Sequence, residues 1–173
     1  MPKTTDDDKK PRVGIYMGSS SDAPAMEEAR KMLRERGISC EMAVASAHRS
    51  PERAHKLATT AEERGLEVLI VGAGGAAHLA GAMAANSILP VIGVPLESSA
   101  LKGFDALLAT VQMPGGIPVA TMAIGKAGAK NAAILAAQII ARKDAGLAAR
   151  LRQQKKAMAT AVEESSREVE AGS

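Results

Sequence analysis

The sequence predicts an α/β protein: a single flavodoxin-like, three-layer domain around a five-stranded parallel sheet, with an extra C-terminal helix. Short apolar runs and helical patterns alternate five times with short connections, which is typical of a parallel sheet with helices on both faces. The length of 173 residues suits one domain. Right-handed crossovers between parallel strands then favour the flavodoxin-like strand order.

Apolar runs and punctuating residues place each element. Residues 67–71 (EVLIV) are continuously apolar after the first residue, which indicates a fully buried strand. Pro24 and Pro51 suit the first turn of a helix, and Gly37 and Gly65 suit positions just after a helix ends. The predicted strands are 12–17, 39–45, 67–71, 90–94 and 118–123, and the predicted helices begin at 23 and 51 and then span 76–86, 100–110 and 127–142.

Three segments divide the chain. Residues 1–11 are expected to form a disordered lead, residues 12–143 the α/β domain, and residues 144–173 a C-terminal helical arm. Large apolar residues of the arm fall close to one helical face, with charges between them. This face either packs on its own domain or reaches a neighbouring subunit. The residues concerned are Leu147, Leu151, Met158 and Val162.

Composition excludes several classes of function. Only 1% of the residues are aromatic and the net charge is +3, so the chain offers neither a base-stacking platform nor a basic stripe for nucleic acid. Cys40 is the one cysteine, which excludes an intrachain disulfide and a multi-cysteine zinc site and fits a reducing compartment. No apolar run approaches the roughly 18 residues of a membrane span. We therefore expect a cytoplasmic protein with no nucleic-acid or membrane partner.

Clusters of polar and small residues follow the predicted strands. Because ligands of parallel α/β sheets bind at the carboxyl ends of the strands, these clusters predict one shared site. They bring hydroxyls, a carboxylate, an Arg and two His to this edge, and the segment before the fifth strand is expected there as well. The clusters are GSSSD (18–22), SAHRSP (46–51), GAGGAAHLAG (72–81), PLESSA (95–100) and VQMPGGIP (111–118).

Two of these clusters carry groups suited to an anion and to proton transfer. The GSSSD segment precedes a helix, where it either binds an anion or only caps the helix. Arg49 offers a planar fork for phosphate or carboxylate, and the imidazole of His48 can move a proton; the alternative is an ordinary surface pair. His78 either donates to a ligand or bonds within its turn, whereas His55 is expected on a solvated helix face.

A glycine pattern at residues 72–77 (GAGGAA) admits two interpretations. It matches the G-x-G-x-x-A form of a dinucleotide fingerprint between a strand and a helix. However, it follows the third strand rather than the first, and Glu97 is the only nearby candidate for the acidic partner. The simpler interpretation is that the glycines let the backbone approach a small, flat ligand.

Taken together, the clusters at 17–22, 46–51, 72–81 and 111–121, with GVP (93–95) and AIGKAGAKNAAILAAQI (123–139), resemble the 5-(carboxyamino)imidazole ribonucleotide mutases of bacterial purine biosynthesis. The resemblance covers residues 12–143 in unbroken order. It implies an isomerase that moves a carboxyl group from the exocyclic nitrogen of an aminoimidazole ribonucleotide to ring carbon 4, without ATP, metal or organic cofactor. It also implies a homo-octamer with sites between subunits.

The resemblance assigns roles to individual residues. His48 matches the catalytic His, and Arg49 matches the Arg that binds the substrate phosphate. Ser19 and Asp22 match residues that bind the ribose-phosphate part. The remaining substrate-binding candidates are Ser46 and a loop that closes over the imidazole and carboxylate, comprising Gly74, Ala76, His78 and Leu79.

Single positions distinguish branches of the family. A second branch carboxylates aminoimidazole ribonucleotide directly from carbon dioxide and tends to have Lys where this chain has Arg49, so Arg49 favours the mutase. Ala80 departs from the usual Pro, and Ser50 replaces the usual Thr but keeps the hydroxyl. A nicotinamide-binding oxidoreductase and a non-catalytic flavodoxin-like binding module remain as alternatives.

Overall fold

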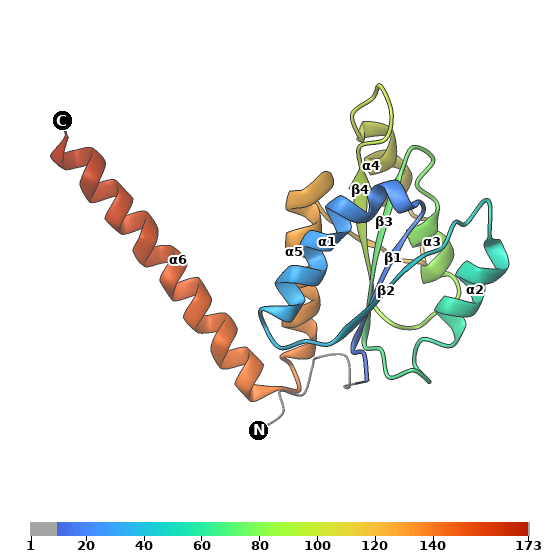
Figure 1. The fold of residues 1–173 in the computed structure, drawn as a ribbon, viewed down its shortest axis with the longest axis horizontal. Helices are drawn as coiled ribbons and strands as arrows, with labels where there is room; N and C mark the ends of the chain where they lie inside the picture. The colour runs from blue at the N-terminus through green and yellow to red at the C-terminus, as the bar shows by residue number, and fades with distance from the viewer. Residues whose placement is uncertain (1–9, 173) are drawn as a thin grey trace. The chain divides into compact units, whose positions relative to one another are not determined.

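A computed structural model describes residues 10–172 and contains a five-stranded parallel sheet (Figure 1). The predicted lead, residues 1–11, lies outside the described residues except for its last two. The strand order is β2-β1-β3-β4-β5, so the predicted flavodoxin-like fold class is confirmed. The strands are β1 (Val13–Met17), β2 (Cys40–Val44), β3 (Val68–Gly74), β4 (Val91–Leu96) and β5 (Ala120–Thr121).

Helices cover both faces of this sheet. On one face α2, α3 and α4 enclose the core, and on the other α1 lies beside the start of α5, where Lys130 pairs with Glu28 at 3.3 Å (Figure 1). A short 3₁₀ helix, η2, links β1 to α1. The bounds are η2 (Ser20–Asp22), α1 (Ala23–Arg34), α2 (Pro51–Thr59), α3 (Leu79–Ala84), α4 (Phe104–Val111) and α5 (Gly125–Ile140).

Element boundaries differ from the prediction where glycine or proline intervenes. The third helix begins at Leu79 rather than 76, because Gly75 has φ +61° and the chain turns before His78. The fourth helix begins at Phe104 rather than 100, directly after Gly103 with φ +85°. The edge strand β5 has only two residues instead of the predicted six from 118 to 123, and Pro118 has no N–H to donate to the ladder.

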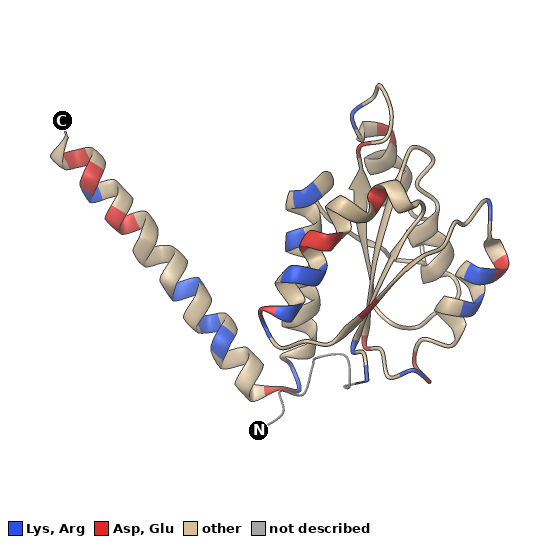
Figure 2. Cartoon of the chain, viewed as in Figure 1, with Lys and Arg blue, Asp and Glu red and all other residues tan. Residues whose placement is uncertain are grey.

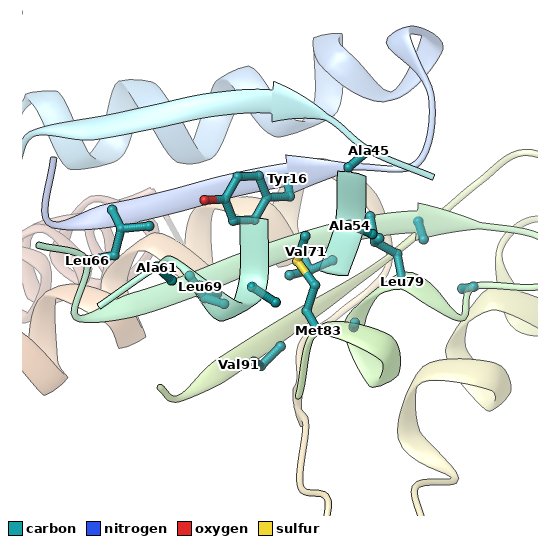
Figure 3. Packing of buried hydrophobic residues seen from close by; sticks show 14 of the residues in the cluster. Tyr16, Ala45, Ala54, Ala61, Leu66, Leu69, Val71, Leu79, Met83 and Val91 are labelled. Atoms are coloured by element: carbon teal, nitrogen blue, oxygen red, sulfur yellow. The ribbon is translucent and has the colours of Figure 1, made fainter. Parts of the chain in front are cut away.

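The core on the α2 side is built around Tyr16 of β1, which is fully buried (Figure 3). Tyr16 is aligned with Val71 of β3, and Met83 of α3 packs in the same cluster. Alanines on α2, including Ala54 and Ala58, bring the helix close to the sheet. Each large apolar side chain that is fully buried here stabilises the fold by about 1.5–3 kcal/mol.

The hydroxyl of Tyr16 is also paired. It donates to Glu41 and accepts a hydrogen bond of 2.7 Å from Arg64, which in turn bonds Glu41 at 3.0 Å. Gly14 makes room for the ring, because a Cβ at this position would lie 2.8 Å from it. A polar cluster is therefore built into the apolar layer with partners for its charged and hydroxyl groups.

The chain forms two compact units, and the second begins at Gln138. It contains the predicted C-terminal helix, α6 (Ala145–Ala171), which Asp144 caps by accepting a 2.9 Å hydrogen bond from the N–H of Leu147. Leu147 is buried, whereas Met158 and Val162 are 61% and 69% exposed. Among residues 10–172, no helix has the length and apolar character needed to span a membrane.

Candidate active site

A pocket of about 190 Å³ lies at the carboxyl ends of β1, β2, β3 and β4. Its walls come from the segments that follow these strands, as the geometry of a parallel sheet requires. Each of the nine residues to which the resemblance assigned a catalytic or substrate-binding role lines this pocket. They are Ser19, Asp22, Ser46, His48, Arg49, Gly74, Ala76, His78 and Leu79.

The segment after β1 forms a reciprocal helix cap. The backbone N–H of Ser19 donates to Asp22 Oδ2 at 3.0 Å, and Ser19 Oγ accepts from the N–H of Ser21 at 3.3 Å. Ser21 Oγ also donates to Ser19 Oγ at 2.8 Å. The segment therefore caps the helix, and the cap fixes two hydroxyls on the wall of the pocket.

Asp22 is the buried carboxylate of the pocket. Burial raises its pKa above the ordinary value, because the charged form loses water. The hydrogen bond from Ser19 and the positive charge of Arg49 act in the opposite direction, and burial prevails. A carboxyl group held in this way is a strong acceptor for hydroxyl groups of a ligand.

The segment after β2 holds Arg49 in a fixed turn. The N–H of Arg49 donates to Ser46 Oγ at 3.1 Å, and Ser50 Oγ accepts from the N–H of Ser46 at 2.9 Å. Arg49 Nη2 donates to the carbonyl of Gly18 at 3.1 Å, which ties this segment to the one after β1. Among the described residues this is the one hydrogen bond of the exposed guanidinium, which has five N–H groups. The remaining N–H groups are therefore available to an anion.

His48 and His78 form a direct pair across the pocket. Nε2 of His48 lies 2.7 Å from Nδ1 of His78, and the rings meet edge to face with centroids 4.8 Å apart. One nitrogen must donate its N–H and the other must accept, so the bonded pair carries at most one positive charge. Both side chains are exposed to solvent, which gives them access to a ligand and to protons.

The glycines at the end of the third strand allow close packing. Gly72 and Gly74 both lie within β3 rather than in a turn after it. A Cβ at Gly72 would lie 2.4 Å from Met26 Sδ, and one at Gly74 would lie 2.2 Å from Ser98 Oγ. A dinucleotide fingerprint needs these glycines in the turn that opens a helix, so the structure disfavours the nicotinamide interpretation.

The structure confirms the expectation for His55 and contradicts the expectation for the segment 111–118. His55 lies outside the pocket on the exposed face of α2, as predicted, with Nδ1 2.9 Å from Asn86 Oδ1. The segment 111–118 was expected at the site edge, and this expectation is wrong. Gly116, Ile117 and Pro118 line a separate cavity of about 820 Å³, together with residues that precede β4. A segment that precedes a parallel strand lies at its amino end, opposite the site.

Several lining residues were not singled out from the sequence. Ser21 and Ser98 belong to clusters that follow strands, and this position could have indicated that they lie near the site. The sequence does not show which serine of each cluster lines the pocket. The small residues form the wall without polar side chains and carry no signal of their own. The additional lining residues are Gly18, Ser21, Ala47, Ala73 and Ser98.

Comparison with known proteins places the chain in a family. The family model described as AIR carboxylase matches residues 12–161. The N5-carboxyaminoimidazole ribonucleotide mutase of Pyrococcus horikoshii is 54% identical over 162 residues, which is 94% of this chain and 90% of the relative. The mutase of the same name from Bacillus subtilis is 54% identical over 157 residues, covering 91% and 97%.

A solved structure agrees with these matches. The crystal structure of Treponema denticola PurE superimposes with a TM-score of 0.80 at 29% identity, over 89% of this chain and 95% of that chain. The similarity therefore extends over nearly the whole length in sequence and in fold. The chain belongs to the AIR carboxylase family.

Proposed function

We propose that the chain is a mutase of purine biosynthesis that converts 5-(carboxyamino)imidazole ribonucleotide to 4-carboxy-5-aminoimidazole ribonucleotide. The observation that carries the proposal is the composition of one pocket, in which the segment after β2 carries the Arg49 guanidinium and a hydrogen bond between His48 and His78 joins this segment to the one after β3. The two relatives described above, both 54% identical, are named for this activity.

The phosphate end of the substrate is assigned to the first two segments. Arg49 supplies paired N–H donors, and the hydroxyls of Ser19, Ser21 and Ser46 stand beside it on the pocket wall. Asp22 accepts hydrogen bonds from the ribose hydroxyls. The bond from Arg49 to the Gly18 carbonyl joins the two segments before substrate arrives, which lowers the ordering cost of binding.

The reacting end is assigned to the small-residue wall. Gly74, Ala76 and Leu79, with Ala47 and Ala73, present a tight apolar surface. Breaking the carbamate releases carbon dioxide, which must stay beside ring carbon 4 until the ring attacks it. Confinement of the two fragments makes the second stage effectively unimolecular, an effect that reaches about 7–11 kcal/mol in favourable cases.

Proton transfer is assigned to His48. In the first stage the bond between the exocyclic nitrogen and the carboxyl carbon breaks, its electron pair stays on nitrogen, and nitrogen takes a proton from the imidazolium of His48. Ring carbon 4 then attacks carbon dioxide. Neutral His48 removes the proton from carbon 4, the electron pair returns to the ring, and the imidazolium is regenerated. His78 holds Nε2 of His48 through a direct hydrogen bond, which limits the pair to one positive charge.

We further propose that the reaction needs no ATP, metal or organic cofactor, that the protein is cytoplasmic, and that it assembles as a homo-octamer with sites between subunits. Residues 12–143 would form the catalytic domain and residues 144–173 an arm toward a neighbouring subunit. Exposed apolar side chains support assembly on both parts, including Phe104 and Leu108 of α4 and Met158 and Val162 of α6.

The test is to incubate the purified protein with 5-(carboxyamino)imidazole ribonucleotide without ATP and to follow formation of the carbon-4 carboxylate. A parallel reaction with aminoimidazole ribonucleotide and bicarbonate separates the mutase from direct carboxylation. Conversion of the carbamate faster than of the bicarbonate mixture is expected. Equal rates, or no conversion, would contradict the proposal, and NADH binding in the same pocket would support the oxidoreductase instead.

A further inference from the structure

Helix α6 carries an apolar stripe that is exposed along most of its length. Met158, Val162 and Val169 are 61%, 69% and 71% exposed, and Leu151 is half-buried. With Lys155 and Ser165 between them, these residues follow the alternating four- and three-residue spacing of a coiled-coil seam. An apolar seam of this length on an exposed helix indicates a second helix as its partner.

The charges of α6 are segregated along its axis. Its first half carries positive charge and its second half negative charge, with Arg167 as the exception (Figure 2). The basic residues are Arg150, Arg152, Lys155 and Lys156, and the acidic residues are Glu163, Glu164, Glu168 and Glu170.

This order of charges is unfavourable within a single helix. Carboxylates are stabilised near the start of a helix and cations near its end, which is the reverse of what α6 shows. Like charges also stand four residues apart, as in Arg152 and Lys156 or Glu164 and Glu168, and such pairs destabilise a helix. The favourable interactions of these segregated charges must therefore be with groups outside the helix.

We propose that the α6 helices of two copies of this chain pair antiparallel about a two-fold axis level with Thr160. Leu151 and Val169 are equally far from Thr160, as are Met158 and Val162, so the axis places each apolar residue of one helix opposite one of the other. The polar seam residues Lys155 and Ser165 likewise face each other. Such a polar layer specifies register in coiled coils.

The same axis matches the charges. It sets the basic half of each helix, with Arg152 and Lys156, beside the acidic half of the other, with Glu164 and Glu168, and this match of halves occurs twice by symmetry. A parallel pair in register would instead set each basic half beside the other basic half. Charge complementarity thus selects the antiparallel orientation and a second copy of α6 as the occupant. The inference does not depend on the proposed mutase activity.

Disulfide trapping tests the orientation in the full-length protein with Cys40→Ala. Leu151→Cys and Val169→Cys variants are produced separately and together in the same cells, with tags of different size. The antiparallel pair predicts a mixed disulfide between the two variants and none between identical copies. Disulfides between identical copies would show a parallel pair, and no disulfide in any combination would show that another surface covers α6; either result overturns the proposal.

Charge reversal tests the pairing itself. Arg152→Glu with Lys155→Glu and Lys156→Glu gives α6 a net negative charge, and Glu163→Lys with Glu164→Lys and Glu168→Lys gives it a net positive charge. We expect each triple variant alone to lose association at least tenfold in sedimentation velocity and a mixture of the two to regain it. An unchanged assembly, or a mixture that stays dissociated, contradicts helix pairing.

A matched control separates net charge from position. Lys31→Glu with Lys56→Glu and Lys143→Glu changes the net charge as much as the acidic variant does, at exposed positions outside α6. It should keep the parent's assembly, and far-UV circular dichroism should show that all variants retain their helices. Dissociation of the control to the same degree would attribute the effect to net charge and overturn the proposal.

Discussion

The sheet domain contains two polar clusters, which differ in how completely their hydrogen-bonding groups are paired within the protein. In the cluster of Tyr16, Glu41 and Arg64, the hydroxyl both donates and accepts, and the guanidinium reaches Glu41 and the carbonyl of Leu57 as well. In the pocket, His48 and Arg49 are exposed, and each side chain has a single protein partner among the described residues.

The electrostatics follow the same division. Burial, reinforced by the hydrogen bond to Glu41, raises the pKa of Tyr16 far above its usual range, so its hydroxyl stays protonated as a fixed donor. Groups that are buried and fully paired stabilise the fold, because loss of one partner leaves the other without its bond. Groups that keep spare donors in a pocket are available to a ligand. The two clusters should therefore respond to substitution in opposite ways.

The sharpest test of this contrast is His48→Asn. Asn keeps a polar side chain of similar shape but cannot exchange a proton near neutral pH, so turnover should fall by about 100-fold or more. The melting temperature should stay near that of the parent, because the side chain is exposed. Turnover within tenfold of the parent would show that His48 does not carry out the proton transfer.

Arg49→Ala should act mainly on substrate binding. A phosphate contact is present in the ground state and the transition state alike, so KM should rise with little change in kcat. A charge-assisted hydrogen bond contributes about 1.5–3 kcal/mol, which corresponds to roughly a tenfold to hundredfold increase. Steady-state kinetics measure both constants, and an unchanged KM in a folded protein would contradict the assignment.

Glu41→Ala should reverse this pattern. It removes a hydrogen-bond partner that Tyr16 and Arg64 share, and we expect the free energy of unfolding to fall by about 1–3 kcal/mol in urea titrations. kcat/KM should remain near that of the parent once the protein is folded. Tyr16→Phe is the matched control with a smaller loss, because Arg64 and Glu41 still pair. A large catalytic effect without loss of stability would break the contrast between the clusters.

The smallest effect is expected for Asp22→Asn, which tests a buried group inside the pocket. Since burial raises the pKa of Asp22 in the folded state, ionisation of this carboxyl costs stability. The cost appears as pH rises from the ordinary Asp range through the raised pKa and is complete above it. The variant should therefore melt slightly above the parent at pH 7. The difference should vanish in acid, and a constant difference across pH would disprove this cause.

The sequence by itself determined the sheet and the edge that carries the site. Hydrophobic runs placed the strands, and the chain order of strands and helices led to a parallel sheet, whose geometry gathers the segments after each strand. Ser19, Asp22, His48, Arg49 and His78 could therefore be placed together, although they are far apart in the chain. These inferences succeed because they depend on local pattern and on a general rule of parallel sheets.

Only the tertiary structure decided which side chains meet. The contact between His48 and His78, the burial of Asp22 and the clearance between Gly74 and Ser98 each join groups from separate segments. The same holds for the hydrogen bond between Arg64 and the Tyr16 hydroxyl, which no local sequence pattern predicts. Such contacts depend on distances of a few tenths of an ångström between elements, which packing of the whole core sets. Spacing along the chain can bring residues to one edge of the sheet, but it cannot determine their bonds.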